Sequence, residues 1–233
     1  MAIALHDPLI RRLILHTSIW LAVLGAILFV SAGTIHWPQA WVLLIESAVL
    51  GLASGILIAR HDPQLLRERM RGPIQKGQKP WDKALLGGIF ALCMAIPIVA
   101  GVDAVRLQNS QMPLWLEAIG ALALAFGLYT FHVVMETNSY ATAVVRIQSE
   151  RGHRVISTGP YAYVRHPMYA GAIFYFLGFA LLLGSWYAVA IAIVIIGLFG
   201  LRAVWEEETL ARELDGYAAY AERVRHRLIP GLW

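Results

Sequence analysis

Residues 168–201 read MYAGAIFYFLGFALLLGSWYAVAIAIVIIGLFGL, a run that contains no charged side chain and no histidine. As one helix this run would extend about 51 Å, well beyond the roughly 30 Å hydrocarbon core of a bilayer, even with tilt. Gly184 and Ser185 lie at its midpoint, and Trp186 and Tyr187 follow them. Because glycine favours turns and aromatic side chains favour the membrane interface, the run predicts a helical hairpin with two short arms.

Four further apolar segments precede this hairpin. Each has about the 20 residues that a transmembrane helix needs. They are Leu13–Ala32, Ala40–Ala59, Ala84–Val102 and Leu114–Val134. The first is longer than the usual apolar core of a signal peptide, so we expect it to be retained as a helix. Together with the hairpin, these segments predict an all-α fold, a polytopic membrane helix bundle with about six transmembrane spans.

The composition supports a membrane protein and excludes two other classes. The chain of 233 residues is 58% hydrophobic and 15% charged, whereas a soluble globular domain carries about 25% charged residues. A disordered chain needs low hydrophobicity, which this sequence lacks. A disulfide scaffold is excluded because Cys93 is the single cysteine. We find no internal repeat and no linker, so the sequence predicts one membrane domain over residues 1–233.

The basic residues predict the orientation of the bundle. With six spans, 18 of the 19 lysine and arginine residues fall on one side of the membrane, and only Arg106 falls on the other. The positive-inside rule then predicts that both termini are cytoplasmic, in the inner or plasma membrane if the protein is bacterial. The net charge of +4 is therefore mainly a topology signal. We expect membrane lipids as partners and no nucleic acid.

The hairpin also predicts where a polar site would lie. If the chain turns at Gly184, the segment with Arg165 and His166 lies beside the segment with Arg202 and Glu206–Glu208. Polar helix ends near a membrane are common, and this arrangement alone is compatible with side chains that only meet water. Three consecutive glutamates, however, occupy nearly 300° of a helix, so at least one must face protein. The site would then present cationic, imidazole and carboxylate groups, which suit a zwitterionic ligand.

An amphipathic helix is expected near the C-terminus. Leu210, Leu214, Tyr217 and Val224 recur at steps of four, three and seven residues, which is typical of a helix with one apolar face. This face would pack against the membrane or the bundle.

Several motifs resemble one enzyme family. The chain contains GPYAYVRHPMYAG at 159–171, EEE at 206–208, LDGYAAY at 214–220 and RVRHRLIPGLW at 223–233. In this order and spacing they resemble the isoprenylcysteine carboxyl methyltransferase family and its phospholipid methyltransferase relatives. The resemblance is specific over Ser157–Trp233, with a weaker similarity at 138–140. The N-terminal part resembles the family only as apolar spans.

The resemblance implies a methyltransferase that uses S-adenosylmethionine, with residues 136–233 as the cofactor-binding catalytic portion and 1–135 as four N-terminal spans. It implies that one set of side chains lines the cofactor site: Tyr163, Arg165, His166, Pro167, Tyr169, Glu206 and Glu207. Glu208 leaves the register of the acidic pair open by one residue. Arg202 and Glu206 are the expected catalytic residues, and Asn138, Tyr140 and Arg202 are expected on the acceptor side.

The expected reaction is direct transfer of a methyl group from sulfonium to nucleophile, which depends on alignment and on exclusion of water. A carboxylate or thiolate acceptor needs no protein base, whereas an amine must lose a proton. The sequence leaves the acceptor open among isoprenylated protein C-termini, phosphatidylethanolamine, small thiols and other lipophilic or amphiphilic molecules.

Two other functions are compatible with parts of the sequence. An NADPH-dependent membrane reductase of sterols or other lipids would share a basic, proline-containing tail. A small non-enzymatic transporter would use Glu46 and Glu117, which lie inside apolar spans. We expect no metal, because the histidines and the cysteine form no HExxH or CxxC spacing.

Overall fold

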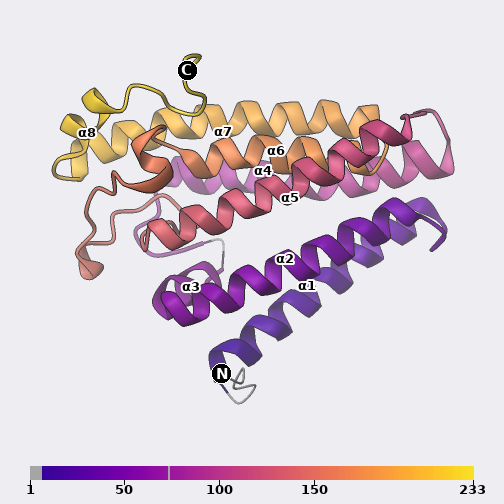
Figure 1. The fold of residues 1–233 in the computed structure, drawn as a ribbon, viewed down its shortest axis with the longest axis horizontal. Coiled ribbons are helices and arrows are strands. Elements are labelled where there is room, and N and C mark those ends of the chain that lie inside the picture. Colours follow the sequence, from indigo (N-terminus) through magenta and orange to yellow (C-terminus); the bar gives the residue numbers. More distant parts are fainter. Residues whose placement is uncertain (1–6, 73) are drawn as a thin grey trace.

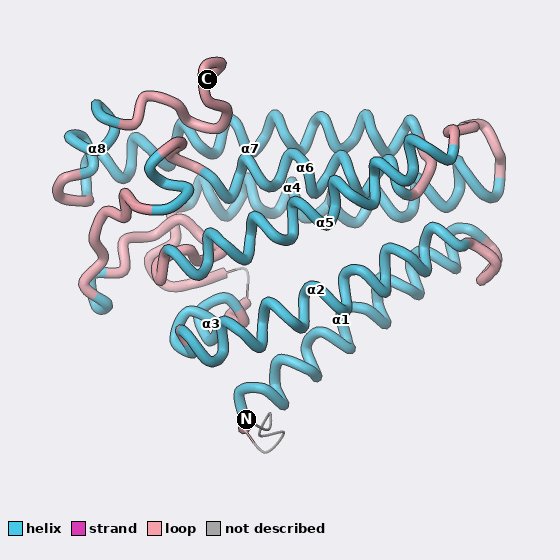
Figure 2. Tube along the Cα trace, viewed as in Figure 1, coloured by secondary structure: helices cyan, strands magenta, loops and turns pink. Residues whose placement is uncertain are grey.

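The computed structural model describes residues 7–72 and 74–233, and this part of the chain is helical without any strand. Figure 2 shows that loops connect the helices mainly at the two ends of an elongated bundle. The α-helices are α1 (Pro8–Ala32), α2 (Pro38–His61), α3 (Pro63–Arg69), α4 (Pro80–Ala100), α5 (Leu114–Thr137), α6 (Pro167–Leu182), α7 (Trp186–Glu213) and α8 (Tyr217–Arg223). A π-helix continues α4 over Gly101–Arg106, and short 3₁₀ turns occupy Ser149–Arg151 and Gly159–Ala162.

The membrane-bundle prediction is confirmed, with a difference in the lengths of the spans. Five helices are long and apolar enough to cross a membrane, namely α1, α2, α4 with its π-helical extension, α5 and α7. The sixth expected span is α6, which has 16 residues and a length of about 24 Å. The hairpin turns where it was expected, because Gly184 has a φ of 76°, a conformation that favours glycine.

Proline fixes the start of most of these helices. Five of them begin with proline at the first helical position: α1, α2, α3, α4 and α6. The ring of proline sets φ for a helix, and its missing N–H would have no intrahelical partner there. By contrast, Pro97 lies inside α4 and does not end it, since the chain continues into the π-helix.

The most extensive helix packing in the bundle joins α5 and α6. A Cβ at Gly127 would lie 2.7 Å from Tyr175 N, and one at Gly171 would lie 2.9 Å from Thr130 Cγ2. Small residues therefore let the two backbones approach each other, as in many membrane helix pairs. Figure 1 shows α4, α5, α6 and α7 running side by side, with α1 and α2 paired below them; α1 contacts α4, and α2 contacts α5.

The C-terminal amphipathic helix exists in two parts. α7 continues to Glu213, and Gly216 with a φ of 82° separates it from α8. The apolar face packs inside the protein: Leu214, Tyr217 and Tyr220 are buried together against Val155 and neighbouring residues. This packing holds α8 over the connection between α5 and α6, at the end of the bundle seen at the left in Figure 1.

Candidate active site

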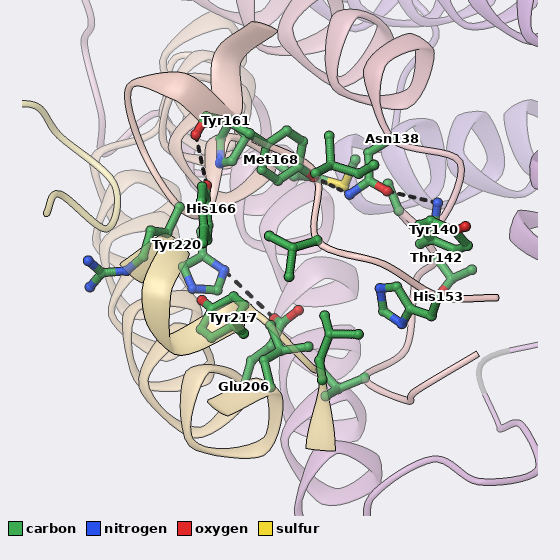
Figure 3. A pocket seen from close by; sticks show the side chains of 18 of the residues that line it. Asn138, Tyr140, Thr142, His153, Tyr161, His166, Met168, Glu206, Tyr217 and Tyr220 are labelled. Carbon is green, nitrogen blue, oxygen red and sulfur yellow. Dashed lines mark hydrogen bonds and ion pairs between the residues drawn. The ribbon is translucent and has the colours of Figure 1, made fainter. Parts of the chain in front are cut away.

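A cavity lies at this end of the bundle, between the α5–α6 connection, the first turn of α6, the last turns of α7 and α8 (Figure 3). Its empty space is about 830 Å³, including the part open to solvent. The residues that line it include Asn138, Tyr140, Thr142, His153, Val155, Ile156, Tyr161, Arg165, His166, Pro167, Met168, Tyr169, Glu206, Leu210, Tyr217 and Tyr220.

The hairpin supplies one wall of the cavity. Tyr169 of α6 donates its hydroxyl hydrogen to Glu206 of α7. The His166 ring stacks parallel to the Tyr169 ring with 5.3 Å between centroids, and its Nδ1 lies 3.9 Å from Glu206 Oε2. Figure 3 shows the Glu206 carboxylate and the His166 ring facing the same space. The wall therefore presents a carboxylate acceptor beside an imidazole.

The opposite wall is the connection between α5 and α6. Asn138 Nδ2 donates to the Tyr161 hydroxyl over 2.8 Å, and Asn138 Oδ1 accepts from Tyr140 N over 2.8 Å. The Tyr140 ring lies 4.5 Å from the ring of His153. The Asn138 amide thus bonds both tyrosines, and a pair of flat rings forms one edge of the cavity.

Two tyrosine hydroxyls near this wall stay protonated at neutral pH. Tyr220 Oη donates to the Tyr161 carbonyl over 2.8 Å. Burial raises the pKa of Tyr161 well above its ordinary value and raises the pKa of Tyr220 to about 12. Both groups therefore act as neutral hydrogen-bonding groups.

His153 is neutral at physiological pH. Burial lowers its pKa to about 4, and the positive charges of Arg151 and Arg146 add to this shift. Gln148 N lies 3.4 Å from His153 Nδ1. An uncharged imidazole at this position suits the tilted ring contact with Tyr140.

Glu207 lies outside the cavity lining, at the centre of a cluster that contains two arginines and a histidine. Its Oε1 lies 2.6 Å from Arg165 Nε and 3.2 Å from His166 Nε2, and its Oε2 lies 2.9 Å from Arg227 Nε. Arg165 also donates from Nη1 to the carbonyls of Val224 and Arg225. The Glu207 cluster therefore ties α7 and the start of α6 to the C-terminal segment.

Arg202 is also placed behind the cavity wall. It is 5% exposed, and its Nε donates to Asp82 Oδ1 over 2.8 Å while Nη2 donates to the Ala143 carbonyl over 2.9 Å. Its guanidinium lies 5.5 Å from the centroid of the Tyr169 ring. Arg202 thus links α7 to the first turn of α4 and supports the ring that bonds Glu206.

The structure brings together most of the side chains expected at the site. The expected residues that line the cavity are Asn138, Tyr140, Arg165, His166, Pro167, Tyr169 and Glu206. Tyr163 is 72% exposed and does not line it. Glu206 faces the cavity, Glu207 faces the cations, and Glu208 is exposed.

Among the lining residues that were not expected, four carry aromatic side chains: His153, Tyr161, Tyr217 and Tyr220. Tyr161, Tyr217 and Tyr220 lie within the motifs quoted above. The sequence therefore places them near the site, but it does not show that their side chains point into the cavity. Within residues 7–72 and 74–233, no group of three or more histidine, cysteine, aspartate or glutamate side chains is arranged to hold a metal ion.

Comparisons with known proteins agree with these features. The model of the phospholipid methyltransferase family matches residues 115–215. The chain is 27% identical to protein-S-isoprenylcysteine O-methyltransferase of Schizosaccharomyces pombe over 232 residues, which cover 90% of this chain and 95% of the relative. It is 26% identical over 145 residues to protein-S-isoprenylcysteine O-methyltransferase B of Arabidopsis thaliana, covering 60% of this chain and 73% of the relative.

A third relative is protein-S-isoprenylcysteine O-methyltransferase of Saccharomyces cerevisiae, 30% identical over 109 residues that cover 46% of each chain. The matched family region contains Glu206 and Glu207 and the whole α6–α7 hairpin. The chain is an integral membrane methyltransferase similar to the isoprenylcysteine carboxyl methyltransferases and the phospholipid methyltransferase family.

Proposed function

We propose that the cavity binds S-adenosylmethionine and that the protein methylates the carboxylate of an isoprenylated cysteine. The observation that carries this proposal is the cavity wall on which Glu206 and His166 lie side by side, opposite the Tyr140–His153 ring pair. The three relatives are named for isoprenylcysteine O-methylation, and this supports the choice of acceptor.

The residues of the cavity fit the chemical groups of the donor. Glu206 is an acceptor for an ammonium group or a ribose hydroxyl, and His166 is a donor for a carboxylate when its ring N–H faces the ligand. The flat faces of Tyr140 and His153 suit a purine ring. A neutral His153 matches an uncharged aromatic ligand group better than an imidazolium would.

The bound donor supplies an electrophilic methyl group on a sulfonium cation. The protein's task is then to align this group with the acceptor and to exclude water. Apolar side chains such as Val155, Ile156 and Leu210 line the cavity and limit its hydration. A carboxylate acceptor is already an anion, so no side chain has to remove a proton before transfer.

Arg202 is the proposed cation on the acceptor side. Its Nη1 makes no hydrogen bond to any residue of the described chain, while its other nitrogens hold Asp82 and Ala143. Since Arg202 lies behind Tyr169, we assign it a positioning role through its charge and through the Tyr169 ring. Asn138 and Tyr140 line the cavity at the end of α5 and are the proposed acceptor contacts.

We also propose that the cavity opens to the cytoplasm and that both termini lie on that side. The first helical turn of α1 and the region around α3 carry exposed arginines, for example Arg11, Arg12, Arg67 and Arg71, and basic residues concentrate on the cytoplasmic side of membrane proteins. A membrane-bound acceptor would then approach between helices while the soluble donor enters from water.

Calorimetric titration of the detergent-purified protein with S-adenosylhomocysteine, and with NADPH as the comparison, tests the cofactor. We expect saturable binding of S-adenosylhomocysteine alone. Transfer of labelled methyl groups to N-acetyl-S-farnesylcysteine, phosphatidylethanolamine and a small alkyl thiol then tests the acceptor. Binding of NADPH alone, or of neither compound to folded protein, would refute the donor, whereas labelling of another acceptor alone would refute only the isoprenylcysteine.

A further inference from the structure

A second polar cavity lies at the opposite end of the bundle. The turns that connect α1 to α2, α4 to α5 and α6 to α7 meet at this end (Figure 1). The cavity contains about 630 Å³ of empty space, including the part open to solvent, and Gln39, Gln108, Ser110, Glu117 and Gly184 are among the residues that line it. No lysine or arginine is part of its lining in the described chain.

Glu117 presents to this cavity a carboxylate oxygen that can still accept hydrogen bonds. Its Oε2 accepts from Gln39 Nε2 over 2.8 Å. Within the part of the chain that the structure describes, Oε1 accepts no hydrogen bond and no cationic side chain lies within 4.0 Å of the carboxylate. A Cβ on Gly184 would lie 3.0 Å from Oε1, so this oxygen faces the α6–α7 turn that borders the cavity.

A second carboxylate lies directly behind Ser110. Asp103 is 4% exposed, and its Oδ2 accepts from the hydroxyls of Ser110 and Ser185, each over 2.5 Å. Its Oδ1 is buried and has no hydrogen-bond partner among residues 7–72 and 74–233. A carboxylate oxygen behind the wall thus has no partner among the described protein groups, and Asp103 adds to Glu117 in attracting a positively charged group to the cavity.

Exposed aromatic side chains indicate where this cavity lies relative to the membrane surface. Trp115 is 64% exposed, Trp186 is 47% exposed and Tyr187 is 61% exposed, and all three lie in the first turns of α5 and α7 at this end. Tryptophan and tyrosine concentrate at the level of lipid headgroups. The cavity is thus within reach both of headgroups and of small solutes.

We propose that this cavity binds a primary ammonium group, supplied by an ethanolamine headgroup or by a free alkylamine. A primary ammonium has N–H donors for Glu117 Oε1 and for the amide oxygens of the neighbouring glutamines, whereas a quaternary ammonium has none. In the described residues, no group of three metal-ligating side chains is present, so the acceptor set favours an organic cation. This site is separate from the methyl-transfer cavity.

Binding of lipids to delipidated protein, measured by native mass spectrometry without methyl donor, tests the proposal. We expect the wild-type protein to retain phosphatidylethanolamine better than phosphatidylcholine. Loss of one charge-assisted hydrogen bond in Glu117→Gln should weaken phosphatidylethanolamine binding roughly 10- to 100-fold. Glu136→Gln, an exposed glutamate near the other end of the same helix, is the matched control and should bind like the wild type.

A measurement on the wild type alone guards against a variant that fails to fold. Affinity should fall stepwise from phosphatidylethanolamine through its monomethyl and dimethyl derivatives to phosphatidylcholine, because each methyl group replaces an N–H. Displacement of the lipid by millimolar ethanolamine would identify a free amine as a sufficient ligand, and lack of displacement would identify the headgroup. Equal binding of the four lipids, or unchanged binding in Glu117→Gln, would overturn the proposal.

Discussion

Glu207 Oε1 lies 2.6 Å from Arg165 Nε, and this ion pair joins the last turns of α7 to the start of α6. The same carboxylate holds Arg227, while the backbone N–H groups of Arg165 and His166 donate to the carbonyls of His226 and Arg227. Glu207 therefore fastens the C-terminal segment beside the cavity, and its neighbour Glu206 faces the cavity itself.

Replacing Glu207 by glutamine should release this C-terminal segment. The buried Arg165 guanidinium would lose its counter-charge, and such a loss is unfavourable in a partly desolvated site. We expect trypsin to cleave after Arg223, Arg225 or Arg227 several times faster in Glu207→Gln than in the wild type, in detergent at neutral pH. Glu208→Gln, on the exposed side of α7, is the control, and equal cleavage rates in both variants would contradict this role.

Glu206→Gln should affect ligand binding more than stability. Glu206 lines the cavity and accepts from the Tyr169 hydroxyl, and glutamine keeps an acceptor oxygen but loses the charge. Because a charge-assisted hydrogen bond contributes about 1.5–3 kcal/mol, we expect affinity for S-adenosylhomocysteine to fall roughly 10- to 100-fold. Calorimetric titration measures this affinity, and an unaltered value would show that Glu206 does not bind the cofactor.

The fold could be predicted where it depends on short stretches of sequence, such as apolar runs and turn residues. An apolar run with Gly184 at its centre specifies a hairpin, since segment length and turn chemistry can be derived from the sequence alone. The end of α7 was not predictable in this way. The apolar run ends at Leu201, but the helix continues to Glu213, because charged residues can extend a helix beyond its membrane-spanning part.

The directions of side chains depended on packing that the sequence does not display. Glu206 and Glu207 are neighbours about 100° apart on a helix, and only the C-terminal segment determines which of them meets cations. Tyr161 lies inside a 3₁₀ turn over Gly159–Ala162 and lines the cavity, whereas Tyr163 follows the end of that turn and is exposed. Arg202 is buried by Asp82, a partner 120 residues away.

Breaking the Arg202–Asp82 pair should destabilise the bundle. Asp82 is fully buried and accepts from Gln78 Nε2 and Val145 N as well as from Arg202. Removing one partner of a buried pair costs roughly 3–5 kcal/mol, so Asp82→Ala should lower the free energy of unfolding by about this amount in detergent denaturation. The wild type and the exposed-site variant Asp215→Ala provide the comparison.

A double variant distinguishes the contribution of Arg202 to stability from its proposed role in positioning the acceptor. Arg202→Met with Asp82→Leu replaces the pair by apolar side chains and should recover much of the lost stability. If Arg202 also positions the acceptor, methyl transfer stays low and KM for the acceptor rises in this stable double variant. Wild-type turnover in the double variant would show that Arg202 is only a structural link.

His153 makes the stability of the protein depend on pH. In the unfolded chain its pKa returns to about 6.5, whereas in the folded protein burial and the charges of Arg151 and Arg146 lower the pKa to about 4. Between these values the unfolded state binds a proton that the folded state does not, so stability falls as pH falls through this window. Above about pH 6.5 this contribution is constant.

His153→Gln should remove this dependence and leave the rest of the pH profile unchanged. We expect thermal unfolding in detergent to show a smaller loss of stability from pH 6.5 to pH 4.5 in His153→Gln than in the wild type. Because the folded imidazole stays neutral, affinity for S-adenosylhomocysteine in the wild type should show no titration of this group between pH 6.5 and 8. Parallel stability profiles for the two proteins would show that His153 titrates alike in the folded and unfolded states. The assignment of a half-buried, neutral imidazole beside Tyr140 would then be wrong.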